Sequence, residues 1–220
     1  MPVTTRQIIQ CRADAILRAW VKDPLIQVIA ERPEVLARLV FLDTLGEGAE
    51  SGRLGRYGAR NVAMVTQPGP PDANASVWVR TKYGSYRAAY EAFLGTAYTH
   101  QIGTVDLSGY DVDHLLNRAR SPEGSAFIRL EAVRSEVNQA WGRLFEKAAS
   151  DDSFWANQNR TRRTMSYLIA AKLGGQMPPN GPTDSAGIRR LALFFGRYGL
   201  NVRESTEGIQ NMLNFSYKVR

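Results

Sequence analysis

The side chains best suited to chemistry lie in two short segments of the chain. Residues 110–114 read Tyr-Asp-Val-Asp-His, and residues 137–142 read Val-Asn-Gln-Ala-Trp-Gly. Carboxylate and carboxamide oxygens are preferred ligands of hard divalent cations, and an imidazole with a pKa near neutral pH can take a proton from water. Brought together, these groups would hold one cation and activate a water molecule beside it.

The elements that must position these side chains are two strands and a helix. Alternating apolar residues predict strands over 104–113 and 126–133, with a turn at 121–124 between them. Ser135 can cap a helix over 136–149, whose apolar residues recur at helical spacing. The predicted local order is therefore strand, loop, strand, helix.

The period of a strand restricts which of these side chains can meet. Successive residues of a strand point to opposite faces, so Asp111 and Asp113 would share one face and His114 would lie on the other. A cation ligand and a base can meet only if the strand breaks or twists at about Asp113. If it does not, Asp111 and Asp113 form the better chelating pair.

This order of elements resembles the ββα-metal core of HNH endonucleases, also called His-Me finger nucleases. The resemblance rests on Asp113-His114 near the end of the first strand and on Asn138, followed by Trp141-Gly142, in the helix. It covers about residues 105–150.

The resemblance implies a role for each of these side chains. His114 would be the general base, and Asp113 and Asn138 would bind one Mg²⁺, Mn²⁺ or other divalent cation, with Asp111 as a further ligand. The cation would stabilise charge on the phosphorus centre and on the departing oxygen. The resemblance thus implies hydrolysis of a phosphodiester bond.

One position departs from the family pattern. In HNH endonucleases the second strand usually begins with an asparagine that orients the histidine, and here that position holds Ile128 or Arg129. Three alternatives follow: a backbone carbonyl orients His114, Arg129 contacts the scissile phosphate as a catalytic residue, or the active site is degenerate.

The net charge of +7 is unevenly distributed along the chain. Residues 153–220 hold 10 Lys and Arg against 3 Asp and Glu, whereas residues 1–152 hold 18 of each kind. This excess favours a polyanionic partner, because each neutralised phosphate releases counterions; solubility alone is the alternative. The candidate phosphate-binding residues are Arg118, Arg120, Arg160, Arg162 and Arg163, which Arg189 and Arg190 would extend.

The remaining pattern predicts an α+β protein that is mostly helical, with a small ββα-metal core flanked by N-terminal and C-terminal helices. Three regions are expected: 1–75, helices followed by a Gly- and Pro-rich loop; 76–152, the nuclease core; and 153–220, basic helices. Their expected helices cover 4–20, 24 onward, 34–45, 86–94, 154–173, 184–198 and 205–215, and their expected strands cover 61–66 and 76–81.

Composition narrows the class of protein. The single cysteine, Cys11, excludes an intrachain disulfide and a multi-cysteine zinc site. No apolar run approaches the roughly 20 residues that cross a bilayer, and no signal-peptide pattern opens the chain. We therefore expect a cytoplasmic protein without a membrane partner, with delivery to another cell by a signal-peptide-independent secretion system as an option.

These observations predict a metal-dependent endonuclease that cuts nucleic acid, with DNA favoured over RNA. No base-reading motif is present, so little sequence specificity is expected. Such an enzyme would suit an antibacterial toxin held by an acidic inhibitor (immunity) protein. The alternative is a catalytically inactive, helical nucleic-acid-binding or adaptor protein.

Overall fold

The computed structural model describes residues 3–23, 26–31, 50–67, 69–116, 127–143 and 164–218. In chain order its elements are α1 (Thr5–Lys22), β1 (Ile29–Ala30), β2 (Glu50–Gly52), β3 (Val62–Thr66), α3 (Pro71–Asn74), β4 (Ala75–Arg80), α4 (Tyr86–Ala97), β5 (Tyr110–His114), β6 (Phe127–Arg134), α5 (Ser135–Trp141), α7 (Tyr167–Leu173), α8 (Ser185–Gly196) and α9 (Val202–Lys218). No helix within these ranges is long and apolar enough to cross a lipid bilayer.

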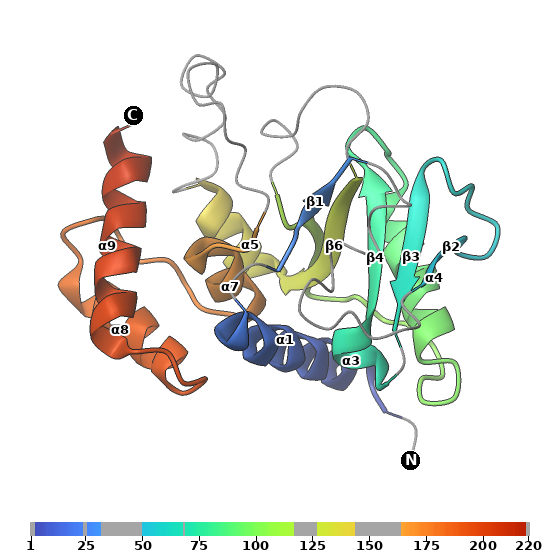
Figure 1. The fold of residues 1–220 in the computed structure, drawn as a ribbon, viewed down its shortest axis with the longest axis horizontal. Coiled ribbons are helices and arrows are strands. Elements are labelled where there is room, and N and C mark those ends of the chain that lie inside the picture. The colour runs from blue at the N-terminus through green and yellow to red at the C-terminus, as the bar shows by residue number, and fades with distance from the viewer. Residues whose placement is uncertain are drawn as a thin grey trace.

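Six strands form one antiparallel sheet in the order β1-β6-β4-β3-β2, with β5 also paired to β6 (Figure 1). β4 pairs with residues 127–130 of β6, so β1 and β5, which pair with 127–128 and 130–134, share the opposite edge. Every residue of β6 except the last is buried. β6 is therefore the strand on which the sheet is assembled.

The prediction of a mostly helical protein with a small ββα-metal core is wrong. The two strands expected to form that core, β5 and β6, belong to the six-stranded sheet. β1 lies where a helix was expected from residue 24, and β2 lies in the predicted loop. A hairpin alone buries too little surface to be stable, and its unpaired edges accept further strands.

Other predicted elements are confirmed by the structure. α1 begins as expected at Thr4, whose Oγ1 accepts a hydrogen bond from the Gln7 backbone N–H at 3.2 Å, while Gln7 Oε1 accepts one from Thr4 N at 2.9 Å. β3, β4, α4, α8 and α9 lie within a few residues of the predicted ranges. Of the helix predicted over 154–173, only α7 falls in the described residues, and the helix predicted over 34–45 lies outside them.

The strands on either side of the boundary predicted near residue 75 are directly paired. β3 and β4 are neighbours in the sheet, with a register that runs from Val62↔Val79 to Thr66↔Ala75. The sheet thus draws its strands from both of the first two predicted regions.

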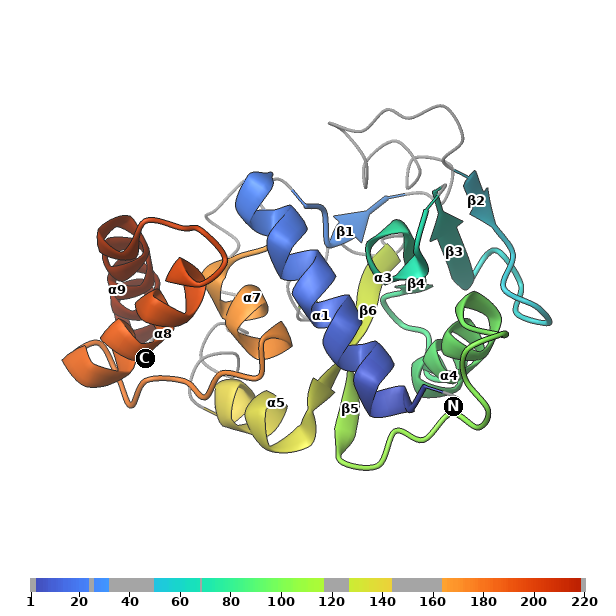
Figure 2. The same cartoon turned by 90° about the horizontal axis from the view of Figure 1, so that it is seen from below.

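Most helices pack below the sheet or to one side of it, and α4 lies behind β3 at the other end (Figure 1). Figure 1 shows α1 and α3 below the strands, and α5 and α7 between the sheet and the α8–α9 pair. Seen from below, α1 runs from the N-terminal end near β5 and α4 toward α7 and β1 (Figure 2). Its first turns contribute Ile8 and Ile9 to one hydrophobic cluster, and its last turns contribute Ile16 and Trp20 to another. α1 therefore joins the two clusters.

A buried carboxylate ties α1 and α4 to β6. Glu131 accepts hydrogen bonds from Arg12 Nη2 at 2.7 Å and Nε at 3.1 Å, and from Arg129 Nη2 at 3.0 Å and Nε at 3.2 Å. The Tyr90 hydroxyl donates to the same carboxylate at 3.1 Å. All three charged side chains are at most 3% exposed. We call Arg12, Tyr90, Arg129 and Glu131 the Glu131 network.

Electrostatics keep the Glu131 network ionised. Burial by itself would raise the pKa of the Glu131 carboxyl, but the charges of Arg12 and Arg129 hold it below its ordinary value. Burial is the largest single effect on Arg12 and acts to lower its pKa, but the Glu131 carboxylate, Tyr90 and Tyr98 together outweigh it, so the pKa of Arg12 lies above its ordinary value. Further donors of Arg12 reach the carbonyl oxygens of Pro71 and Ala75, each at 3.1 Å.

Glu131→Gln should lower the free energy of unfolding by about 3–5 kcal/mol, because it leaves two buried guanidiniums without a counter-charge. Urea denaturation followed by circular dichroism measures the loss. Glu136→Gln is the matched control, since Glu136 is 62% exposed and should cost less than about 1 kcal/mol. Equal losses in the two variants would mean that the network does not hold α1 to the sheet.

Candidate functional site

β5 carries the carboxylates and the imidazole as a regular strand. It pairs with β6 at every position from Tyr110↔Arg134 to His114↔Leu130. Asp113 is itself paired, opposite Glu131, so the strand does not break there. The alternation of the strand therefore sends Asp111 and Asp113 to one face and His114 to the other.

On the first face, Asp111 meets the beginning of α5. Its carboxylate accepts hydrogen bonds from Ser135 Oγ at 2.7 Å and from Asn138 Nδ2 at 3.2 Å. Ser135 is the first residue of the helix rather than its cap, and its backbone N–H donates to the carbonyl of Gly109 at 2.9 Å. Two of the three predicted metal ligands, Asp111 and Asn138, are thus in direct contact.

The third predicted ligand, Asp113, is paired with a buried lysine. Lys172 Nζ lies 2.6 Å from Asp113 Oδ2, and the two side chains are 3% and 17% exposed. Lys172 comes from α7, in a run of residues that is buried from Ile169 to Leu173. The lysine ammonium stands where a cation bound to this carboxylate oxygen would lie.

The predicted base, His114, lies on the opposite face of β5. Its side chain is 8% exposed, and its ring is 4.5 Å from the ring of Tyr86 in an edge-on arrangement. Tyr86 is the first residue of α4, whereas Asn138 belongs to α5. The structure therefore does not bring His114 and Asn138 together.

Arg129, the other predicted catalytic residue, is part of the Glu131 network. Its side chain is 3% exposed, and both of its hydrogen bonds in the network go to Glu131 Oε1. Burial lowers the pKa of Arg129, and the Glu131 carboxylate opposes that effect. A guanidinium held in this way is not presented to a phosphate in solvent.

As they lie, these residues do not fit the hard divalent cation that the family resemblance implies. Asp113 is ion-paired with Lys172, and each oxygen of Asp111 accepts a hydrogen bond, from Ser135 and from Asn138; as a hydrogen-bond donor, the Asn138 amide nitrogen faces Asp111 instead of a shared cation. Within the described ranges, no group of three or more His, Cys, Asp or Glu side chains is placed to hold a metal ion. We therefore derive no reaction step through a metal.

The candidate phosphate-binding residues all lie outside the described residues: Arg118, Arg120, Arg160, Arg162 and Arg163. Arg189 and Arg190, which were expected to extend this set, are exposed on α8, as is Arg197 at its end. We call these three residues the α8 arginine surface. At 3.6 residues per turn, all three fall within about 100° of the helix circumference. The half-exposed Leu193 lies between them. Residues 185–197 contain no Asp or Glu.

The buried side chains of Lys172 and Arg12, which pair with Asp113 and Glu131, were not predicted as buried charges from the sequence. Lys172 follows Leu168-Ile169-Ala170-Ala171, and Arg12 lies between Ile8, Ile9 and Ala13 on the apolar stripe of its helix. A charge on an apolar helical stripe is a signal of a buried ion pair, because it has no access to water there. The partner in each case is distant in sequence and was not predictable from that signal.

Comparison of the chain with protein-family models, with curated proteins and with solved structures finds no match. The residues and their geometry are therefore the only basis for proposing a function.

Asp113→Asn should lower the free energy of unfolding by about 3–5 kcal/mol, because the buried Lys172 ammonium loses the carboxylate that lies 2.6 Å from it. Adding Lys172→Met should restore most of the loss, since it removes the buried ammonium whose pairing Asp113→Asn weakens. Urea denaturation of the four chains of this double-mutant cycle measures the coupling. Additive losses would contradict a buried ion pair between the two side chains.

Proposed function

We propose that the protein binds nucleic acid through its basic C-terminal third and that the segment resembling an HNH endonuclease does not hydrolyse it. The observation that carries this proposal is the α8 arginine surface, in which Arg189, Arg190 and Arg197 are exposed on one side of a helix. The binding takes place in the cytoplasm and shows little sequence preference.

Charge and geometry support a phosphate backbone as the ligand of this surface. Arg189 and Arg197 are eight residues apart, which places them about 12 Å apart along the helix axis. Successive phosphates of one DNA strand advance about 3.4 Å along the duplex axis, so the surface spans three or four of them. Arginine donates two parallel hydrogen bonds to a phosphate, which suits contacts that do not read bases.

The proposal excludes hydrolysis because the predicted catalytic groups are held apart or neutralised. His114 contacts Tyr86 on one face of β5, while Asp111 and Asn138 meet on the other. Asp113 pairs with Lys172, and Arg129 pairs with Glu131. A general base has to lie within hydrogen-bond reach of the proton it abstracts, and here it faces a different side of the sheet.

The triple variant Arg189→Ala/Arg190→Ala/Arg197→Ala removes the α8 arginine surface and tests whether it binds DNA. Its affinity for a fluorescently labelled 25-base-pair duplex should fall roughly 10- to 100-fold at low salt, because three phosphate contacts are lost. The slope of log affinity against log salt should become less steep by about 2 to 3. Fluorescence anisotropy at several salt concentrations measures both quantities.

The matched control removes three exposed arginines from elsewhere in the chain, as Arg56→Ala/Arg60→Ala/Arg80→Ala. It makes the same change in net charge and should lose less than threefold in affinity. Equal losses in the two variants would assign the binding to overall charge instead of the α8 arginine surface. No binding by the unmodified protein would overturn the function itself.

A second candidate function is metal-dependent endonuclease activity on DNA, as an antibacterial toxin restrained by an acidic inhibitor protein. The observation that favours it is the contact of the Asp111 carboxylate with the Asn138 carboxamide, at 3.2 Å between strand and helix. It would require Asp113 to leave Lys172 and His114 to leave Tyr86.

A cleavage assay with supercoiled plasmid distinguishes the two functions. We expect the plasmid to stay intact after incubation with the protein in Mg²⁺, Mn²⁺ or EDTA, because base and ligands do not meet. Nicking that needs Mg²⁺ or Mn²⁺, stops in EDTA and is lost in both His114→Ala and Asn138→Ala would overturn the binding-only proposal in favour of the endonuclease.

A further inference from the structure

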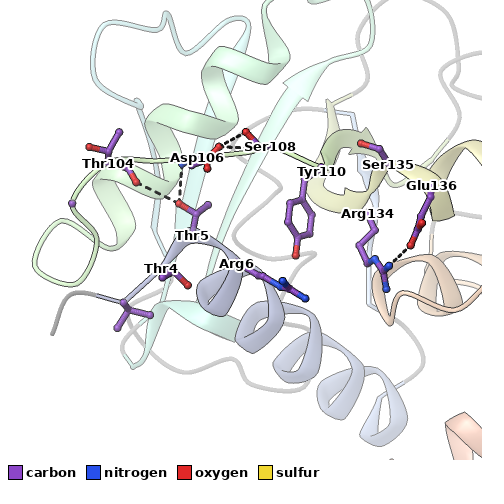
Figure 3. A pocket seen from close by; sticks show the side chains of 13 residues that line it. Thr4, Thr5, Arg6, Thr104, Asp106, Ser108, Tyr110, Arg134, Ser135 and Glu136 are labelled. Carbon is purple, nitrogen blue, oxygen red and sulfur yellow. Dashed lines mark hydrogen bonds and ion pairs between the residues drawn. The ribbon is translucent and has the colours of Figure 1, made fainter.

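A groove opens where the first turn of α1 meets the β5–β6 hairpin. It has a volume of about 840 Å³ and is lined by residues from three segments: the start of α1, residues 103–110, and the junction of β6 with α5 (Figure 3). The wall is fixed to the helix, because Asp106 N donates to Thr5 Oγ1 at 2.9 Å. We call this cavity the α1–β5 groove.

Three hydrogen-bond donors line the groove. Figure 3 shows the side chains of Arg6 and Tyr110 reaching toward one another from α1 and β5, with Arg134 of β6 beside them and joined to Glu136. Tyr110 and Arg134 are directly opposite each other in the register of the two strands, so their side chains are neighbours on one face. Within the described residues, Arg6 has no ion pair or hydrogen bond through its guanidinium.

Arg134 can turn toward a ligand at little cost. It pairs with Glu136 two residues along, and the two side chains are 57% and 62% exposed. Exposed ion pairs contribute between zero and about 1 kcal/mol, so a phosphate can replace the carboxylate. The helix end itself contributes less, since Thr4 and Gln7 already cap the first turn of α1.

The groove also offers a carboxylate at its far end. Hydrogen bonds from the Ser108 side chain and backbone lower the pKa of Asp106, at 2.6 Å and 2.8 Å. The carboxylate of Asp106 is thus ionised at neutral pH and can accept hydrogen bonds from ligand N–H or O–H groups. Arg6 and Arg134 are balanced by Asp106 and Glu136, so these four groups have no net charge.

We infer that the α1–β5 groove binds one nucleoside monophosphate unit, either free or as an unpaired nucleotide of a single strand. The phosphate lies between Arg6 and Arg134, the base stacks against Tyr110, and Asp106 accepts hydrogen bonds from the sugar or base. Two guanidiniums can neutralise one phosphate, and the carboxylates of Asp106 and Glu136 would repel the additional charges of a polyphosphate or a duplex. The volume lies within the range of small-molecule sites.

The assignment of a nucleotide to this groove rests on the proposed nucleic-acid-binding function. The groove contains none of the residues of the α8 arginine surface. The two proposals therefore fail separately. Loss of duplex binding in the α8 triple variant should leave nucleotide binding within twofold of the unmodified protein.

Isothermal titration calorimetry with deoxyadenosine 5′-monophosphate, deoxyadenosine and inorganic phosphate tests the site. The monophosphate should bind at least tenfold more tightly than either fragment, because only it engages both ends of the groove. Arg6→Ala and Tyr110→Ala should each weaken it at least fivefold. Arg18→Ala, which removes an exposed arginine of the same helix outside the groove, should change it less than twofold.

Comparison of the monophosphate with a single-stranded oligonucleotide shows whether the groove binds a free nucleotide or a nucleotide of a strand. Tighter binding of a single-stranded oligonucleotide than of the monophosphate, weakened by Arg6→Ala, assigns the groove to nucleic-acid strands. Equal affinity assigns it to the free nucleotide. The inference is overturned if millimolar monophosphate gives no heat of binding, or if Arg6→Ala and Arg18→Ala bind it equally well.

Discussion

Burying the Glu131 carboxylate costs several kcal/mol in lost hydration, and the cost is offset only where its oxygens are fully hydrogen-bonded. Arg12 from α1, Arg129 from β6 and Tyr90 from α4 meet that condition together. If any of them moves away, a charge or a polar group is left unpaired in the interior. The network therefore fixes how α1 and α4 sit on the sheet, and the α1–β5 groove inherits its shape from that placement.

A second constraint follows from the pairing of β5 with β6. Because the register continues through His114↔Leu130, the strand keeps its two-residue period to its end. The chemistry that the sequence suggests needs Asp113 and His114 on one side, and the paired strand separates them. Each side chain then finds a different partner: Lys172 on one face and Tyr86 on the other. This separation of the predicted catalytic groups is the reason we propose binding without hydrolysis.

Local signals predicted many of the helices and strands, but not the sheet that long-range pairing assembles. Residues 4 and 184 were predicted as the starts of two helices, and Thr4 and Asp184 are the N-caps of α1 and α8, where each side chain accepts a hydrogen bond from a backbone N–H three residues along. β1 was missed because a two-residue strand has no period of its own and exists only through its pairing with β6. For the site, the family resemblance grouped Asp111 and Asn138 as ligands of one cation, and these two side chains are in contact. The sequence predicted that His114 would lie on the other face from Asp111 and Asp113 unless the strand broke at about Asp113.

The sequence by itself determined the elements with a clear period or cap, the excess of positive charge in the last third, and the set of side chains capable of chemistry. Only the tertiary structure decided which of them meet. Lys172 reaches Asp113, and Arg12 reaches Glu131, across 59 and 119 positions of the chain. No local pattern encodes such contacts, because a buried charge selects whichever partner the packed elements bring within hydrogen-bonding distance.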